Sequence, residues 1–498
     1  MFDLVIQLIK SRFGKEPTSP RGIYMSLYES LRKLIESGDL PADTLLPPTR
    51  LLCDALQLSR STTVKAYNLL TENQLIISKH GSGFRVKSIP HTAHLGDISM
   101  AQYPGISELG QSFLNNIHLL DSTNDEGLAF TPGLPPVDIF PIHHWQKLSN
   151  LYWRTIKSID LNYSVSSGIG SLKRSIADYL LLSRRIKCDP EQVVIVSGSL
   201  QSLYLIGSVL INKGDTVCME NPTFPNVISI FKSLQAHVLP VGVDDEGIAV
   251  TEMETNPFKQ AKLVHVTPSN HYPVGGKMSF SRRYQLLRWA SENDAMIIEN
   301  DYEHEINNWQ APTESIFSLD KEQRTIYLST FNRILHPSIR LGYMVLPPHL
   351  LPAVKALQMH SHRFVPQSIQ VVMTEFINQN LIYKHIRTAI EEAADRKAFF
   401  VSQFERLFET GLVLKPATVA SFHLLAQMPE HVSDIEVSKA LEAKGIVTHA
   451  LSKCYLGPTK QRGLILGYSC INKSSTAQVL AKMASIVNSM KLHPPTAP

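Results

Sequence analysis

The sequence lacks long apolar runs, paired cysteines and an obvious export signal. Its best apolar stretch, residues 203–211, is far shorter than the roughly 18 residues that a membrane helix needs. The 5 cysteines are scattered without a C-x-x-C pair, so neither a disulfide framework nor a zinc site is expected. No basic segment precedes the apolar N-terminal run MFDLVIQLIK, which makes it a poor signal peptide. These absences predict a cytoplasmic protein with no membrane segment and no metal.

Net charge is also scarce, yet it is unevenly distributed. The 498 residues carry a formal charge of +4. Residues 1–90 hold 12 Lys and Arg against 8 Asp and Glu, whereas the rest of the chain is balanced. Between residues 60 and 87 the charged side chains are Arg60, Lys65, Lys79, Arg85 and Lys87 with the single acid Glu72. Such a local excess is typical of a nucleic acid-binding module.

The pattern of residues 20–88 predicts helices followed by a β-hairpin. Helices are expected at residues 23–37, 49–56 and from Ser59 or Ser61 to about Asn73, on the basis of apolar spacing and capping residues. Two short apolar stretches then flank the turn at residues 80–83. This order of elements is that of a winged helix-turn-helix DNA-binding domain. A small helical domain with a solvated basic face is the alternative.

The third predicted helix supplies the candidates for DNA contact. Val64, Tyr67 and Leu70 are expected to face inward, which leaves Arg60, Ser61, Thr62, Thr63 and Lys65 near the end that enters the major groove in such motifs. Basic and hydroxyl side chains there reach phosphates or base edges. In the wing, His80 and the glycines that include Gly81 are expected beside the DNA backbone.

The same segment resembles the DNA-binding domain of the GntR superfamily of bacterial transcription regulators. The resemblance is carried by SGDLPADTLLPPTRLLCDALQLSRSTTVKAYNLL and by HGSGF in the wing. It implies that Arg50, in the P-x-x-R motif, joins the DNA-binding residues. The run Ser61-Thr62-Thr63 departs from the family's S-R-x-T-V pattern, which predicts an altered base preference.

Residues 89–105 are typical of a linker, and residues 106–498 predict a large α/β domain. The linker contains Pro, Gly and His without sustained periodicity. Residues 106–120 have helical spacing and are expected to dock onto the large domain. Strands are predicted at residues 193–196, 216–219, 263–266, 295–298, 325–328 and 342–346, with helices between most of them. Alternating strands and helices indicate a mostly parallel sheet that binds ligands at the carboxyl ends of its strands.

The strand-end motifs of this region resemble those of fold-type I aminotransferases. They are FTPGLPPVDIFPIHHW, IVSGSLQSL, GDTVCMENPTF, HVTPSNHYPVGGKMSFSRR, IIENDYEHEI and YLSTFNRILHPSIRLGYMVLP. Together with the N-terminal module, their order resembles the MocR subfamily, in which a GntR-type module is fused to an aminotransferase-like domain. The resemblance implies pyridoxal phosphate as a cofactor and a homodimer that reads paired half-sites on double-stranded DNA.

Two residues depart from the family at the cofactor site. The resemblance places Arg333 where the family carries the lysine that forms a Schiff base with the cofactor, and Asn300 where it carries the acid that keeps the pyridine nitrogen protonated. A guanidinium stays protonated and cannot form the ordinary Schiff base. Covalent cofactor binding is therefore not expected, and no catalytic residue is assigned.

Other predicted pocket residues remain suited to a ligand. They are Ser199 and Leu200, whose backbone N–H groups suit a phosphate; Thr330 and Arg340, which hold phosphate in the family; Tyr302, beside the cofactor's phenolic oxygen; and Phe224, which can stack on a planar ring. Each is alternatively a core or loop residue without a ligand.

The sequence thus favours a DNA-binding transcription regulator whose degenerate aminotransferase-like domain senses a small molecule, such as a pyridoxal phosphate-related or amino compound. The first alternative is a pyridoxal phosphate-dependent aminotransferase with an appended DNA-binding domain. Non-covalent binding of pyridoxal phosphate, and a DNA-bound scaffold whose large domain only dimerises, are the remaining alternatives.

Overall fold

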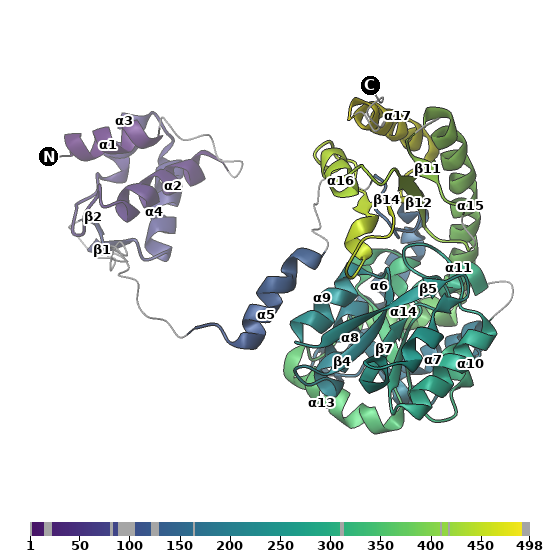
Figure 1. Cartoon of the computed structure of the whole chain (residues 1–498). Coiled ribbons are helices and arrows are strands. Elements are labelled where there is room, and N and C mark those ends of the chain that lie inside the picture. Colours follow the sequence, from purple (N-terminus) through teal and green to yellow (C-terminus); the bar gives the residue numbers. More distant parts are fainter. Residues whose placement is uncertain are drawn as a thin grey trace. The chain divides into compact units, whose positions relative to one another are not determined.

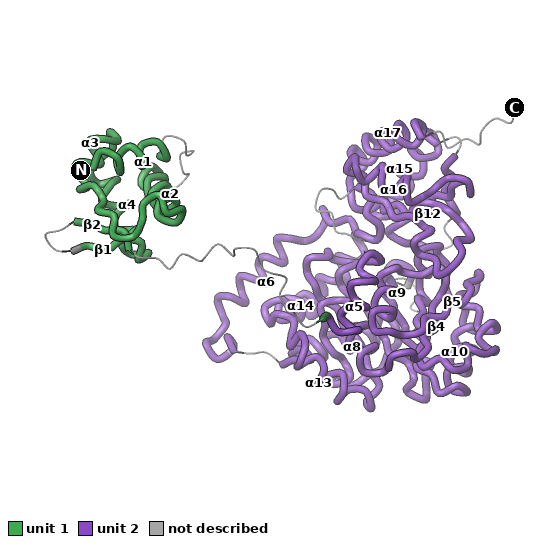
Figure 2. Tube along the Cα trace, turned by 60° about the vertical axis from the view of Figure 1, so that its left-hand side comes forward, with its two compact units in different colours: residues 1–105 green, residues 106–498 purple. Residues whose placement is uncertain are grey.

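The chain divides into two compact units, residues 1–105 and 106–498 (Figure 2). The computed structural model describes residues 2–13, 22–79, 83–87, 105–120, 129–162, 165–308, 313–408, 411–416 and 419–490. None of the helices in these ranges combines the length and the apolarity that crossing a membrane requires. The proposed linker at residues 89–105 lies outside the described ranges except for Gly105.

The small unit is a helical domain with a two-stranded wing. Its elements are α1 (Asp3–Phe13), α2 (Ile23–Glu36), α3 (Thr49–Leu56), α4 (Arg60–Glu72), β1 (Ile76–Lys79) and β2 (Gly83–Val86). The strands pair antiparallel, with Ile76 opposite Val86. Leu27, Leu31 and Leu70 are buried in the core that these elements share. Helix α1 was not predicted; its Ile9 is fully buried in the same core, so the unit begins before residue 20.

Local interactions fix the position of α4. Ser59 is its N-cap, because the Thr62 backbone N–H donates to Ser59 Oγ at 3.1 Å. The Tyr67 hydroxyl donates to the Pro47 carbonyl oxygen at 2.9 Å, and its ring meets the Phe84 ring edge-on at 5.1 Å. These contacts join α4 to the segment before α3 and to the wing.

One predicted DNA contact is wrong. Thr63 has no exposed surface, since α4 buries residues 63, 66, 67 and 70 at the i, i+3, i+4, i+7 spacing of a helix face. The prediction placed Val64 inward instead, and Val64 is only half-buried. Thr63 therefore belongs to the core of the small unit.

The large unit is built on an eight-stranded sheet, which confirms the predicted α/β class. Its order is β3 (Val193–Val196), β10 (Gly342–Val345), β9 (Thr325–Thr330), β8 (Met296–Asn300), β7 (Ala261–Val266), β4 (Thr216–Asn221), β5 (His237–Asp244) and β6 (Gly247–Ile248). The five strands from β9 to β5 are parallel. Strand β10 is antiparallel to both neighbours, and β6 is antiparallel to β5.

Helices cover both faces of this sheet (Figure 1). The helices that follow the linker or cover the sheet are α5 (Glu108–Asn116), α6 (Ile142–Thr155), α7 (Gly170–Arg184), α8 (Ser199–Leu210), α9 (Pro225–Ser233), α10 (Phe280–Glu292), α11 (His304–Asn308), α12 (Ile316–Leu319), α13 (Leu351–Ser361) and α14 (Gln367–Asn378). Strand β3 shows how alternation serves both faces: Val193 and Ile195 join the core with α7 and α14, while Val194 and Val196 join the core with α8 and α9.

A second, antiparallel sheet follows, which the sequence did not predict. Its order is β11 (Val413–Leu414), β12 (His423–Met428), β14 (Arg462–Gly467) and β13 (His449–Ala450). It packs with α15 (Leu381–Leu407), α16 (Asp434–Glu442) and α17 (Lys473–Ser489). Its outer strands are two residues long, too short for a sequence pattern to reveal.

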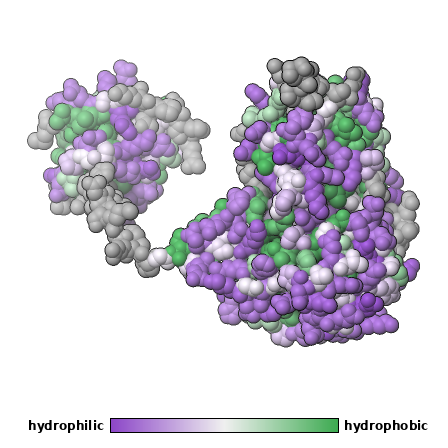
Figure 3. Space-filling model, viewed as in Figure 1, coloured by the Kyte–Doolittle hydropathy of each residue, from purple (hydrophilic) through white to green (hydrophobic). Residues whose placement is uncertain are grey.

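The segment after the linker lies against α9. The Ser112 hydroxyl donates to the Lys232 carbonyl oxygen at 3.1 Å, and the Ser229 hydroxyl donates to the Asn116 carbonyl oxygen at 3.0 Å. The outer side of α5 nevertheless exposes apolar side chains, among them Leu109 and Leu114, and a hydrophobic strip follows the helix in Figure 3.

Candidate functional site

A cavity of about 170 Å³ lies where the strands of the large sheet end. Loops after β3, β4, β8 and β9 and the turn before β10 form its wall. Its lining residues are Gly198, Ser199, Leu200, Leu203, Phe224, Asn226, Val227, Asn300, Tyr302, Thr330, Asn332, Arg333 and Arg340. The structure thus brings all eight cofactor-binding candidates into one cavity, at the edge of the sheet where α/β proteins bind ligands.

The N-terminus of α8 faces this cavity. Gly198 precedes the helix with φ of 146°, in the region that favours glycine, and a Cβ atom there would lie 3.1 Å from Asn332 Nδ2. No side chain in the described part of the chain caps the helix. The first N–H groups of α8, at Ser199 and Leu200, are therefore suited to an anion.

The loop after β9 is held by its own polar side chains. Thr330 Oγ1 accepts a hydrogen bond from the Asn332 N–H and donates one to the Leu341 carbonyl oxygen, both at 3.2 Å. Asn332 Oδ1 accepts from the Leu341 N–H at 3.1 Å. Both side chains tie this loop to the turn before β10, so Thr330 has a positioning role, and Arg333 is presented from a fixed backbone.

The Arg333 guanidinium lies close to two aromatic rings. Its Cζ atom is 5.6 Å from the centroid of the Tyr302 ring and 5.9 Å from that of Phe224. Nη1 donates to the Pro132 carbonyl oxygen over a long 3.4 Å. A Cβ atom on Gly133 would lie 1.4 Å from Nη1, so the guanidinium occupies the space that this glycine leaves.

Asn300 presents a neutral amide at the end of β8. It is 4% exposed, and its Nδ2 lies 3.2 Å from Nε2 of the buried His265. Burial lowers the pKa of His265 to about 3, so this imidazole is neutral at physiological pH. Asn300 Oδ1 makes no hydrogen bond within the described part of the chain.

The two aromatic side chains of the cavity wall already make contacts with neighbouring residues. Phe224 stacks on Tyr272 with centroids 3.7 Å apart and planes at 8°, which covers one face of its ring. The Tyr302 hydroxyl donates to the Asn270 carbonyl oxygen at 2.9 Å. Burial raises the pKa of the Tyr302 phenol well above its ordinary value, so it stays protonated.

A buried acid lies near Arg333. Glu303 Oε2 accepts hydrogen bonds from Asn270 Nδ2 at 2.9 Å and from the Ser421 hydroxyl at 3.1 Å. Burial raises the pKa of Glu303, and the positive charge of Arg333 opposes that rise. The carboxyl group belongs to the wall behind the cavity and is not among its lining residues.

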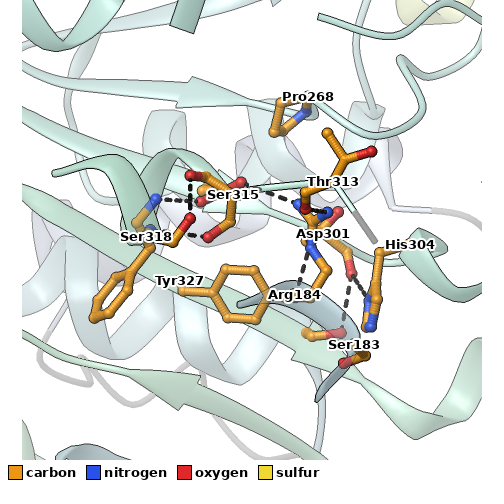
Figure 4. Close-up of polar contacts among 12 residues, drawn as sticks. Ser183, Arg184, Pro268, Asp301, His304, Thr313, Ser315, Ser318 and Tyr327 are labelled. Carbon is orange, nitrogen blue, oxygen red and sulfur yellow. Dashed lines mark hydrogen bonds and ion pairs between the residues drawn. The ribbon is translucent and has the colours of Figure 1, made fainter. Parts of the chain in front are cut away.

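A buried charge cluster next to Asn300 was missed by the sequence analysis. Arg184 on α7 pairs with Asp301 through Nε and Oδ2 at 2.6 Å, and the Tyr327 hydroxyl donates to the same oxygen at 2.9 Å (Figure 4). Burial would raise the pKa of Asp301, but the Arg184 charge holds it below its ordinary value. The cluster fixes Asp301, and hence the direction of Asn300. An aspartate at the end of an apolar strand was the available signal that a buried cation lay nearby.

The candidate DNA-binding residues of the small unit are mostly on its surface. Arg50, Arg60, Ser61 and Lys65 are exposed and Thr62 is half-buried. The hydroxyls of Ser61 and Thr62 lie 2.9 and 2.7 Å from Ser59 Oγ, so the helix cap orients them. His80 and Gly81 lie outside the described residues.

The described residues hold no candidate metal centre. No group of three His, Cys, Asp or Glu side chains lies together as an ion would require. Nor does a lysine belong to the described lining of the cavity, where Arg333 and Arg340 are the basic residues.

Comparison with known families assigns both units. Residues 23–86 match the gntR family of bacterial regulatory proteins, and residues 140–465 match aminotransferase class I and II. The chain is 30% identical over 465 residues to the probable rhizopine catabolism regulatory protein MocR of Rhizobium meliloti, and 93% of each chain is covered. It is 24% identical to the pyridoxine biosynthesis transcriptional regulator PdxR of Corynebacterium glutamicum, over 95% of this chain and 97% of the relative.

Solved structures share the fold of the large unit. An archaeal alanine:glyoxylate aminotransferase superposes with a TM-score of 0.68 at 22% identity, over 77% of this chain and 96% of that one. The Pyrococcus horikoshii kynurenine aminotransferase superposes with a TM-score of 0.66 at 23% identity, over 80% and 99%.

Proposed function

The chain belongs to the MocR-type regulators, in which a GntR-type module precedes an aminotransferase class I and II domain. We propose a separate role for each of its two units. The protein is a transcription regulator that binds double-stranded DNA through residues 20–88. Its large unit, residues 106–498, binds a small effector in the cavity at the strand ends without catalysing transamination. The cytoplasm is the proposed site of action.

The surface of the small unit supports the DNA-binding role. Arg50, Arg60 and Lys65 are exposed, and no acidic side chain occurs between residues 55 and 71 to oppose the last two. Cations on the first turns of a recognition helix attract phosphates and are placed to enter the major groove.

The described lining of the cavity lacks the groups that would hold the family's cofactor covalently. Pyridoxal phosphate bound in the enzyme manner needs a lysine amine and an acid beside the ring nitrogen. Arg333 and Asn300 line the cavity, and no lysine is among the lining residues that the structure describes. These residues do not fit a covalently held cofactor. The combination of Arg333 and neutral Asn300 is the observation that carries the sensing role, and it disfavours the aminotransferase alternative.

A homodimer completes the proposal. Trp153 on α6 is 60% exposed, and Ile159 and Leu161 in the following turn are 77% and 66% exposed. Apolar side chains gathered in one short stretch are typical of a surface that a second protein covers. We assign that partner to a second copy, which would present two DNA-binding units to paired half-sites.

Selection of binding sites from random duplex DNA, followed by footprinting of the full chain, tests the regulatory function. The expected result is a protected region with two related half-sites, which weakens steeply between 50 and 200 mM salt because phosphate contacts release counterions. Absence of any protected sequence at low salt would contradict the DNA-binding role.

A further inference from the structure

The cavity of the large unit is positively charged. Its described lining contains two guanidinium groups, Arg333 and Arg340, and no carboxylate. Cations gathered in a concave site without acids raise the local concentration of anions. The uncapped N-terminus of α8, a helix of 12 residues, adds the positive end of its dipole to the same space.

Arg333 has unused hydrogen-bonding capacity. A guanidinium carries five N–H donors in a planar fork that matches a carboxylate. Within the described chain, the Arg333 guanidinium makes one hydrogen bond, the 3.4 Å contact to Pro132, and no ion pair within 4 Å. The rings of Phe224 and Tyr302 hold it in place without using those donors. It is therefore oriented in advance for a planar anion.

Asn300 provides a second, independent sign of a ligand. Its side chain is 4% exposed and lines the cavity, and its Oδ1 has no partner among the described residues. A buried carbonyl oxygen without a donor costs free energy. A ligand N–H or O–H group placed against Oδ1 would remove that cost.

We propose that the cavity binds, without a covalent bond, a small planar phosphate ester that also carries a carboxylate. The phosphate lies against the N-terminus of α8 and Arg340, the carboxylate pairs with the Arg333 fork, and a ring N–H or hydroxyl donates to Asn300 Oδ1. This inference rests on the proposed sensing function and specifies its ligand. The substitution of an amine by a guanidinium converts a site for an aldehyde into a site for an oxyanion.

The proposal predicts an order of affinity among ligands that differ in one group. A carboxylate beside Arg333 gains a charge-assisted bidentate contact, an alcohol gains a neutral hydrogen bond, and an ammonium group is repelled. The probes are 4-pyridoxic acid 5′-phosphate, pyridoxine 5′-phosphate and pyridoxamine 5′-phosphate, which share the ring and the phosphate.

Calorimetric titration of the full chain with these three probes tests the proposal. We expect the carboxylate to bind at least tenfold more tightly than the amine, with the alcohol between them. Arg333→Met should reduce the ratio of carboxylate to amine affinity to about twofold, and Arg340→Gln should weaken all three ligands without changing their order. Arg288→Met, at an exposed arginine on α10, is the matched control and should change nothing. A circular dichroism melt checks that each variant folds.

The outcomes separate this inference from the proposed function. Equal or tighter binding of the amine, an unchanged ratio in Arg333→Met, or no binding of any probe would each overturn the inference. If footprinting still shows a protected operator, the DNA-binding role stands and only the ligand assignment fails. If footprinting shows none, the regulatory function fails, whatever the titrations give.

Discussion

In the small unit Arg50 and Arg60 are exposed, whereas Arg184 and Arg283 in the large unit have no exposed surface. The exposed pair keeps its hydration and is available to phosphates. The buried pair depends on fixed partners, namely Asp301 for Arg184 and the carbonyl oxygens of Glu314 and Pro268 for Arg283. Arg333 lies between these extremes, since it is half-buried and poorly partnered. The environment of each arginine therefore determines its role. The exposed arginines are available to bind phosphate, the buried ones stabilise the fold through fixed partners, and half-buried Arg333 is available to a ligand.

Substitution of the buried Arg184 should have the largest effect on stability. Arg184→Met leaves Asp301 charged and buried without its cation, which we expect to cost the large unit about 3–5 kcal/mol of unfolding free energy. Calorimetry of the full chain should show a lower melting temperature for the large unit and an unchanged transition for the small unit. Arg288→Met removes an exposed i,i+4 pair with Glu292 and should cost well under about 1 kcal/mol. Equal melting of both variants would contradict this contrast.

Protonation of three buried histidines should lower the stability of the large unit in acid. Burial lowers the pKa of His265 to about 3 and those of His271 and His423 to about 4, against 6.5 for an ordinary histidine. Their stabilising contribution is therefore present above pH 6.5 and is lost as the pH falls from there towards 4. Each histidine lowers the free energy of unfolding by up to about 1.4 kcal/mol per pH unit in this range.

Melting temperatures measured between pH 7 and pH 5 check this dependence. His423→Gln should reduce the slope below pH 6.5 by up to about 1.4 kcal/mol per pH unit, while His360→Gln, at an exposed position, should leave it unchanged. Glu220 has the opposite sign: burial raises its pKa from 4.5 to about 8, so its contribution falls as the pH rises from about 4.5 through 8 and offsets one histidine between pH 5 and pH 7. The same slope in His423→Gln and in the unsubstituted chain would refute the prediction.

The exposed arginines give a smaller effect, and on DNA alone. Arg60→Ala should weaken operator binding by about 1–3 kcal/mol if Arg60 contacts a base, or reduce the salt slope by about one if it contacts a phosphate. Arg333→Met should change neither quantity in the absence of effector. Affinities measured at several salt concentrations distinguish these results. Loss of DNA binding in Arg333→Met without effector would contradict the proposal that the small unit binds DNA and the large unit binds the effector.

The smallest effect is expected at Thr63. Its hydroxyl is buried without a partner among the described residues, so Thr63→Val should leave DNA affinity unchanged and keep or raise the stability of the small unit by about 1 kcal/mol. Ser61→Ala, at the exposed neighbour, is the comparison variant and should weaken binding. A loss of affinity in Thr63→Val as large as in Ser61→Ala would contradict the inward orientation of Thr63.

Local patterns were sufficient for part of the fold. Apolar runs located six of the eight strands of the large sheet, all but β5 and β6, and capping residues located α4, because both signals lie within a few neighbouring residues. The rotation of α4 was wrong by one position, since a threonine and a valine are nearly equal in shape and only packing decides which is buried. Helix α1 was missed although Val5, Ile6 and Ile9 have helical spacing.

The residues that line the cavity were predictable from the sequence, but the residues that hold them in place were not. The eight predicted cofactor-site residues follow strand ends, and parallel strands bring such ends together. The partners behind them come from distant segments: Arg184 on α7 braces Asp301, His265 on β7 contacts Asn300, and Gly133 makes room for Arg333. No periodicity in the sequence reports contacts of this kind.

The absorbance spectrum of the purified chain, with and without added pyridoxal phosphate, tests most directly whether the large unit senses instead of catalysing. For a large unit that does not form a Schiff base, the spectrum of the mixture should equal the sum of its parts, and borohydride should leave no cofactor attached to the protein. A new long-wavelength band, with a borohydride-trapped adduct on a lysine, would contradict it.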